Sequence, residues 1–241
     1  MFYDNWKKKT KLEKAGIVTL KLAQDLIFEN VSRDEIVSIY VKGSFPRREM
    51  NVGSDVDTLI VLRTKKYLSE LRRLDKWGKS SGIIPYPQFA GYSLWELKTG
   101  KRIGKGNGAS PSRVVKHLKE YELIFGEDLT KKNLYMREDK DDFEKMVRVF
   151  REKWLPDYEK GAFDFGMLVK QTFWLIENEQ RVKGNTPPHA WKKLRDSIKN
   201  KKHIIYDAWE IRNNPKKDKV ARQAVRKKFI VKLKKYLEKV D

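Results

Sequence analysis

The 241-residue sequence predicts an α+β protein in two parts: a small sheet flanked by helices, then an all-helical bundle. Two short, continuous apolar runs, EIVSIYV at 35–41 and TLIVL at 58–62, are typical of strands buried on both faces. After about residue 140, apolar residues recur only at helical spacing. We therefore expect one domain at 1–130 and a helical bundle domain at 141–241.

The N-terminal part begins with an amphipathic helix predicted at 10–30, ahead of the two strands. Helical spacing returns at 65–80, after the second strand. A third strand is expected at 83–93, where Pro85 and Pro87 favour the edge of a sheet over its centre.

A basic loop and one further helix complete this part. Residues 98–112 are rich in Gly and Lys and lack an apolar period, which predicts a mobile loop. Ser110 and Pro111 form a helix-start signal, so a helix is predicted over 113–125.

The C-terminal part is predicted to be a bundle of four or five helices. Its first helix has apolar residues on one face and is expected to end at Pro156, because proline lacks the N–H that continues a helix. Further helices are predicted at 165–176, 189–198, 203–212 and 225–240.

The charge balance favours a polyanionic partner. Fifty-four Lys and Arg against 33 Asp and Glu leave a formal charge of +21. Such a field attracts nucleotides, RNA or DNA, although a solvated lysine-rich surface is the alternative explanation. No apolar run reaches the roughly 18 residues of a membrane span, and the start of the chain is charged, so we expect a cytoplasmic protein without membrane contact.

The sequence offers carboxylates, not thiolates, as metal ligands. There is no cysteine, and only three scattered histidines occur, which disfavours a zinc site. Carboxylates favour Mg²⁺ or Mn²⁺. Asp55 and Asp57 begin the second strand, where alternation puts both side chains on one face, about 7 Å apart at their backbones. They could hold a divalent cation, or they could be a solvated pair at a strand entry.

A Gly-Ser pair ahead of the aspartates predicts a phosphate-binding turn. Gly43 ends the first strand, Ser44 can cap the next segment, and Pro46 suits the first turn of a short helix over 45–50. Backbone N–H groups at such a helix start, with the Ser44 hydroxyl, could bind a phosphate. The turn and the aspartates would then share one metal-bound nucleoside triphosphate.

GSFPRREMNVGSDVDTLIVL, residues 43–62, resembles the active-site signature of the nucleotidyltransferase superfamily related to DNA polymerase β. It is most similar to the minimal and antibiotic nucleotidyltransferases, which often have GSxARG before SDxD. Pro46 and Arg48 replace the usual Ala and Gly of that pattern. The matching residues are Gly43, Ser44, Arg47, Ser54, Asp55 and Asp57.

The resemblance implies a small mixed sheet flanked by helices. It also implies transfer of a nucleoside monophosphate from a triphosphate bound to Mg²⁺ or Mn²⁺ to an acceptor hydroxyl, and we expect the transferred nucleotide to be AMP. Asp55 and Asp57 would be the catalytic metal ligands, and the other four matching residues would bind the nucleotide, with Arg47 assisting the triphosphate. The acceptor, whether small molecule, protein or RNA, stays open, as does the oligomeric state.

The resemblance also implies a third carboxylate on a later strand, and the corresponding stretch, PYPQFAGYS, has none. Glu96 is the nearest candidate for that catalytic role, and it is equally well explained as an ordinary helix-surface glutamate. The alternatives are therefore a non-catalytic nucleotide or RNA binder that keeps the fold, and an RNA-directed nucleotidyltransferase.

A fainter resemblance lies in the helical part. AWEIRN, residues 208–213, is similar to the start of the HEPN ribonuclease motif, which requires a histidine shortly after its Arg-Asn pair. Positions 216–218 are Lys, Lys and Asp, so the acid–base group of a ribonuclease is missing. Arg212 and Asn213 are interpreted as structural polar groups.

Overall fold

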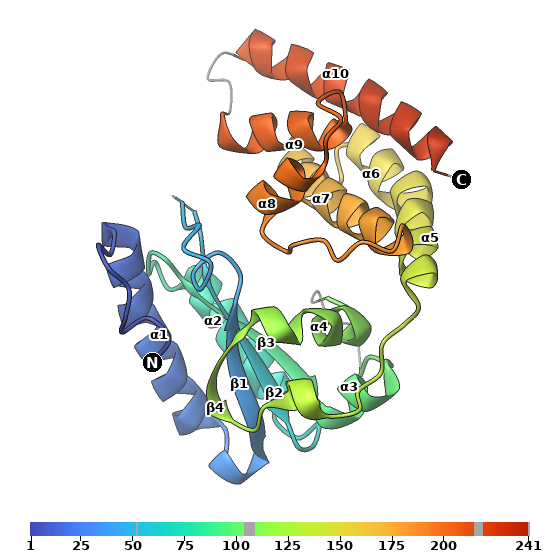
Figure 1. Cartoon of the computed structure of the whole chain (residues 1–241). Helices are drawn as coiled ribbons and strands as arrows, with labels where there is room; N and C mark the ends of the chain where they lie inside the picture. The colour runs from blue at the N-terminus through green and yellow to red at the C-terminus, as the bar shows by residue number, and fades with distance from the viewer. Residues whose placement is uncertain (52, 104–108, 215–218, 241) are drawn as a thin grey trace. The chain divides into compact units, whose positions relative to one another are not determined.

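The computed structural model describes the whole chain except residues 52, 104–108, 215–218 and 241 (Figure 1). The chain separates into two compact units, Met1–Met136 and Arg137–Asp241. Their boundary falls between the two domain ranges expected from the sequence. The first unit contains a sheet and helices and the second contains only helices, so the predicted α+β class is confirmed.

A four-stranded mixed sheet organises the first unit. Its strand order is β3 (Pro87–Ser93), β2 (Val56–Leu62), β1 (Ile36–Lys42) and β4 (Glu122–Gly126). β1 is antiparallel to both β2 and β4, whereas β2 and β3 run parallel. The proline-containing β3 lies at an edge, as predicted.

Helices cover both faces of the sheet (Figure 1). α1 (Lys11–Asn30) and α2 (Leu68–Ser80) contribute Ile27 and Leu71 to the apolar cluster on one face. α3 (Leu94–Thr99), α4 (Pro111–His117) and the 3-10 helices η2 (Leu118–Glu120) and η3 (Leu129–Lys131) cover the other, and η1 (Arg33–Glu35) precedes β1. β1 and β2 are therefore buried on both faces, which explains their continuous apolar sequences.

The prediction of a helix over 113–125 is wrong for the second half of that range. α4 starts as expected, with the Ser110 hydroxyl accepting from the Arg113 N–H, but it ends at His117. Residues 122–126 form β4 instead, with Leu123 opposite Tyr40 of β1. Pairing with β1 satisfies the backbone groups of that strand, a tertiary effect that local periodicity does not reveal. Residues 104–108 of the predicted basic loop lie outside the described residues.

The second unit packs its helices around an apolar core that includes Phe150, Phe173 and Phe229. Its helices are α5 (Asp139–Val149), the π-helical segment η4 (Phe150–Trp154), α6 (Leu155–Glu159), α7 (Phe165–Val182), α8 (Trp191–Ser197), α9 (Ile204–Asn213) and α10 (Lys219–Lys239). The first helix was expected to end at Pro156, but it continues to Glu159. Pro156 lies in the first turn of α6, directly after the π segment, where its missing N–H costs little.

Within the described residues, no helix combines the length and the apolar character needed to cross a bilayer. The Arg212 guanidinium lies 4.2 Å from the centre of the Trp191 ring, and the Asn213 amide donates to the Trp209 carbonyl at 2.9 Å. Both contacts are structural. Positions 216–218, which the HEPN comparison concerns, lie outside the described residues, so that resemblance stays a prediction.

Candidate active site

A tight turn follows β1 at residues 43–48, where a short helix was expected. Its hydrogen bonds run from the Arg48 N–H to the Phe45 carbonyl at 3.0 Å and from the Glu49 N–H to the Ser44 carbonyl at 2.9 Å. Gly43 has φ +83° and Arg48 has φ +58°. The left-handed Arg48 lies inside the expected helix at 45–50 and prevents it from propagating, so this expectation was wrong.

The turn is anchored to α1 by Phe45 and Arg48. Phe45 is fully buried and packs so closely on Gly16 that a Cβ there would lie 2.8 Å from its ring. The Arg48 guanidinium donates to both Glu13 oxygens, at 2.7 and 3.1 Å, and this hydrogen bonding lowers the pKa of the buried Glu13 to about 2. Arg48 replaces a glycine of the family signature, and it keeps the left-handed conformation that glycine adopts without strain.

Asp57 lies in a row of three residues that crosses the sheet. β1 pairs Lys42 with Asp57, and β3 pairs Gln88 with Asp57 on the other side. The Lys42 ammonium donates to Asp57 Oδ1 at 2.9 Å. Asp57 Oδ2 faces the turn: a Cβ on Gly43 would lie 2.5 Å from it. Both the positive φ and this close approach require glycine at position 43.

Asp55 and Asp57 converge on the Gln88 side chain. With its amide nitrogen facing the carboxylates, Gln88 donates to Asp57 Oδ1 and, at 3.1 Å, to Asp55 Oδ2. The Tyr86 hydroxyl also donates to Asp55 Oδ2, at 3.4 Å. Gln88 thus holds oxygens of both aspartates close together. Two neighbouring carboxylates are ligands that suit a divalent ion such as Mg²⁺.

The surroundings of the pair are polar but enclosed. Burial raises the pKa of Tyr86 to about 12, and the Asp55 charge acts in the same direction. Burial also raises the pKa of Tyr121 to about 12. Burial opposes the charged form of Lys42, but the Asp57 carboxylate outweighs it and raises the Lys42 pKa above its ordinary value. Lys42 is therefore a fixed positive charge of the site.

The remaining predicted residues have different positions. The Ser54 hydroxyl accepts from the Asn51 N–H at 2.9 Å and holds the loop before Asp55. The Arg47 guanidinium pairs with Glu49 at 2.9 Å on the turn. Within the described residues, the Ser44 side chain makes no hydrogen bond, and it is partly exposed on the turn.

Glu96 is not brought to the aspartates. It follows the C-terminal end of β3, whereas Gln88 lies at the start of that strand, so most of the strand separates Glu96 from the pair. Its buried carboxylate accepts from the Ser93 N–H at 2.8 Å, in the capping box of α3 whose N-cap is Ser93, and also from the Ile103 N–H at 2.8 Å. These contacts give Glu96 a structural role at the start of α3.

Sequence reasoning missed Lys42, Tyr86 and Gln88. The sequence did contain a signal for two of these residues. Gln88 is the first polar residue of the third strand, and Lys42 directly precedes Gly43. Recognising their role also required the strand register.

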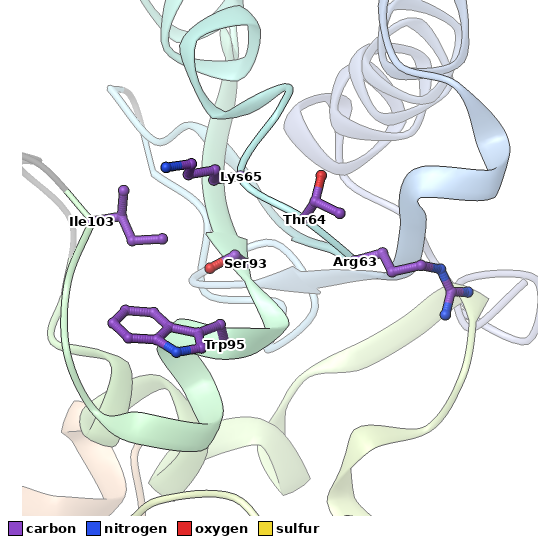
Figure 2. Close-up of a pocket in the computed structure, with 6 residues that line it drawn as sticks. All are labelled: Arg63, Thr64, Lys65, Ser93, Trp95 and Ile103. Atoms are coloured by element: carbon purple, nitrogen blue, oxygen red, sulfur yellow. The ribbon is translucent and has the colours of Figure 1, made fainter.

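A pocket of about 330 Å³ lies at the opposite end of the sheet (Figure 2). It is lined by residues at and after the ends of β2 and β3, including Lys65, Ser93 (the last residue of β3) and the half-exposed Trp95. In Figure 2 the Arg63 side chain points away from the others. The pocket contains neither aspartate, so it is separate from the candidate active site.

Comparison with known families gives one match. Residues 25–87 match the family model of a nucleotidyltransferase domain, a range that includes β1, the turn, both aspartates and β2. No curated protein matches the chain. The match agrees with the signature at 43–62 and with the mixed sheet, and it implies nucleotidyl transfer with a nucleotide substrate. The match therefore supports the nucleotidyltransferase superfamily for residues 25–87, which lie within the first unit.

Proposed function

We propose that the protein transfers AMP from Mg²⁺-bound ATP to an acceptor hydroxyl and releases pyrophosphate. The observation that carries this proposal is the convergence of Asp55 and Asp57 on one donor group beside the Gly43 turn. Phosphoryl transfer depends on positioning and charge neutralisation, which this arrangement can provide without a protein nucleophile.

Asp55 and Asp57 would hold the Mg²⁺, which when bound neutralises phosphate charge and orients the triphosphate. The backbone of the turn at Gly43 and Ser44 would bind phosphate oxygens, because consecutive N–H groups near a left-handed residue form an anion-binding concavity. Arg47 lies on the same turn, where its guanidinium could exchange Glu49 for a phosphate. Ser54 would keep the loop before Asp55 in place.

Among the described residues, no third carboxylate and no histidine groups with Asp55 and Asp57 to accept the proton of the acceptor hydroxyl. In the reaction the acceptor oxygen bonds to the α-phosphorus, the bond to the pyrophosphate oxygen breaks, and the hydroxyl proton must leave. A third carboxylate could accept that proton, but the residue beside the pair is Gln88, whose amide cannot. This observation favours a second candidate function, nucleotide binding without turnover.

The acceptor is proposed on charge alone. The net charge of +21 favours an anionic acceptor, such as an RNA end, over a neutral small molecule or protein side chain. An RNA-directed enzyme would lose affinity for its acceptor steeply as salt rises, because binding releases counterions.

Incubation with α-labelled ATP and Mg²⁺ tests the proposal. We expect the α-label to be transferred to the acceptor and unlabelled pyrophosphate to be released, and both to be lost in the Asp55→Asn and Asp57→Asn variants, whose fold is checked by circular dichroism. Tight ATP binding without any pyrophosphate release, with all three acceptor classes supplied, would support the second candidate. Failure to bind any nucleoside triphosphate would refute both.

A further inference from the structure

The residues around Asp57 divide its two carboxylate oxygens between different partners. Oδ1 accepts from the Lys42 ammonium at 2.9 Å and from the Gln88 amide. Oδ2 lies on the side of Gly43 and the turn. A carboxylate that bridges two metal ions directs one oxygen to each, so the Lys42 contact occupies the oxygen that a second ion would need.

The ligand set of the cluster leads to the same conclusion. Two carboxylates and one ammonium leave a net charge of −1, and Gln88 adds none. Among the described residues, no third acidic, histidine or cysteine ligand joins Asp55 and Asp57 in a group that could hold a metal. A second divalent ion would therefore have to bind through the same two carboxylates, and Lys42 already occupies one of their oxygens.

We propose that Lys42 stands in for a second cation, so that the site takes a nucleoside triphosphate with one divalent ion, and that Gln88 keeps a second ion out. This inference rests on the proposed function. Lys42 directly precedes Gly43, so its ammonium is fixed beside the turn that would hold the phosphates. It is a positioning residue, because its contact is with Asp57.

Manganese binding counts the ions directly. The protein, in excess, is mixed with a triphosphate analogue whose α,β-methylene bridge prevents cleavage between the α- and β-phosphates. Mn²⁺ is then titrated, and the free ion is followed by electron paramagnetic resonance. We expect one Mn²⁺ per bound analogue for the wild type and for Gln88→Asn, which keeps the amide. Gln88→Asp differs from the Asn variant by one group and supplies a carboxylate oxygen in place of the Asp57 oxygen that Lys42 occupies, so it should bind two.

Lys42 is tested without nucleotide. Lys42→Met changes the cluster from −1 to −2, so we expect Mn²⁺ alone to bind at least about tenfold more tightly than to the wild type. The charge-keeping Lys42→Arg variant should show no such gain.

The outcomes separate the two levels of inference. Two Mn²⁺ per bound analogue in the wild type would overturn the Lys42 proposal and leave the proposed function intact. The same holds if Gln88→Asp binds only one Mn²⁺, or if Lys42→Met binds Mn²⁺ no more tightly than the wild type. Absence of analogue binding in the wild type would refute the proposed function itself. If Lys42→Met unfolds, the Gln88 pair decides alone.

Discussion

Replacing Gly43 with alanine tests how the turn and Asp57 depend on each other. The backbone at Gly43 has φ +83°, where an L-residue pays roughly 1–2 kcal/mol. The new Cβ would also lie 2.5 Å from Asp57 Oδ2, so the carboxylate must move. Asp57 is not free to do so, because Lys42 and Gln88 hold its other oxygen. Weakening that charge-assisted contact costs about 1.5–3 kcal/mol more.

We therefore expect Gly43→Ala to lower the free energy of unfolding by about 2.5–5 kcal/mol, measured by urea denaturation. Gly82→Ala is the matched control. Gly82 has φ +74°, and among the described residues nothing lies within 4 Å of an added Cβ, so only the backbone cost of about 1–2 kcal/mol applies.

Manganese affinity, measured in the presence of the triphosphate analogue, provides the second readout. It should fall in Gly43→Ala, because Asp57 is displaced, and stay unchanged in Gly82→Ala. The reasoning is refuted if the two variants lose the same stability and both keep wild-type affinity, since Asp57 would then tolerate the Cβ without cost.

Three further predictions concern stability. Arg48→Ala should destabilise more than Arg48→Gly, by roughly 1 kcal/mol in urea unfolding, because both lose the contact with Glu13 but only alanine keeps the left-handed strain. Equal losses would show that φ +58° costs nothing there. Glu96→Gln should lower the free energy of unfolding by about 1–3 kcal/mol, because the buried carboxylate accepts backbone N–H groups. The variant should bind Mn²⁺ as tightly as the wild type; weaker Mn²⁺ binding would show that Glu96 does belong to the metal site. Glu179, whose pKa of about 2 lies below its unfolded value, stabilises the helical unit above about pH 4.5, and this is lost as pH falls toward 2. Tyr236→Phe removes a donor to Glu179, so unfolding followed against pH should show less loss of stability over that window than in the wild type.

Much of the first unit could be predicted from the sequence because its signals are local. Burial on both faces leaves β1 and β2 as unbroken apolar runs, and Pro85 and Pro87 suit only an edge strand. Strand alternation predicted that Asp55 and Asp57 share one face, although β2 begins only at Val56 and Asp55 precedes it. These features do not depend on which strand lies beside which.

The features that sequence reasoning missed depend on contacts between distant segments. Residues 122–126 have the spacing of a helix, but they become β4 because β1 offers an unpaired edge. The turn after β1 was expected to be a short helix, because nothing local reveals that Glu13, far away in the sequence, would hold Arg48 in a left-handed conformation. Gln88 likewise becomes a partner of the aspartates only through the parallel register of β2 and β3.

The two aspartates differ in how the fold holds them. Asp57 belongs to β2, is paired on both sides and has one oxygen fixed by Lys42, so its position is set before any ligand arrives. Asp55 precedes the strand, in a loop that Ser54 ties to Asn51. A preorganised ligand loses little entropy on binding. Asp55 is also held before any ion binds, because its Oδ2 accepts from Gln88 and from Tyr86, so the ion of the proposed function would meet both carboxylates already in place.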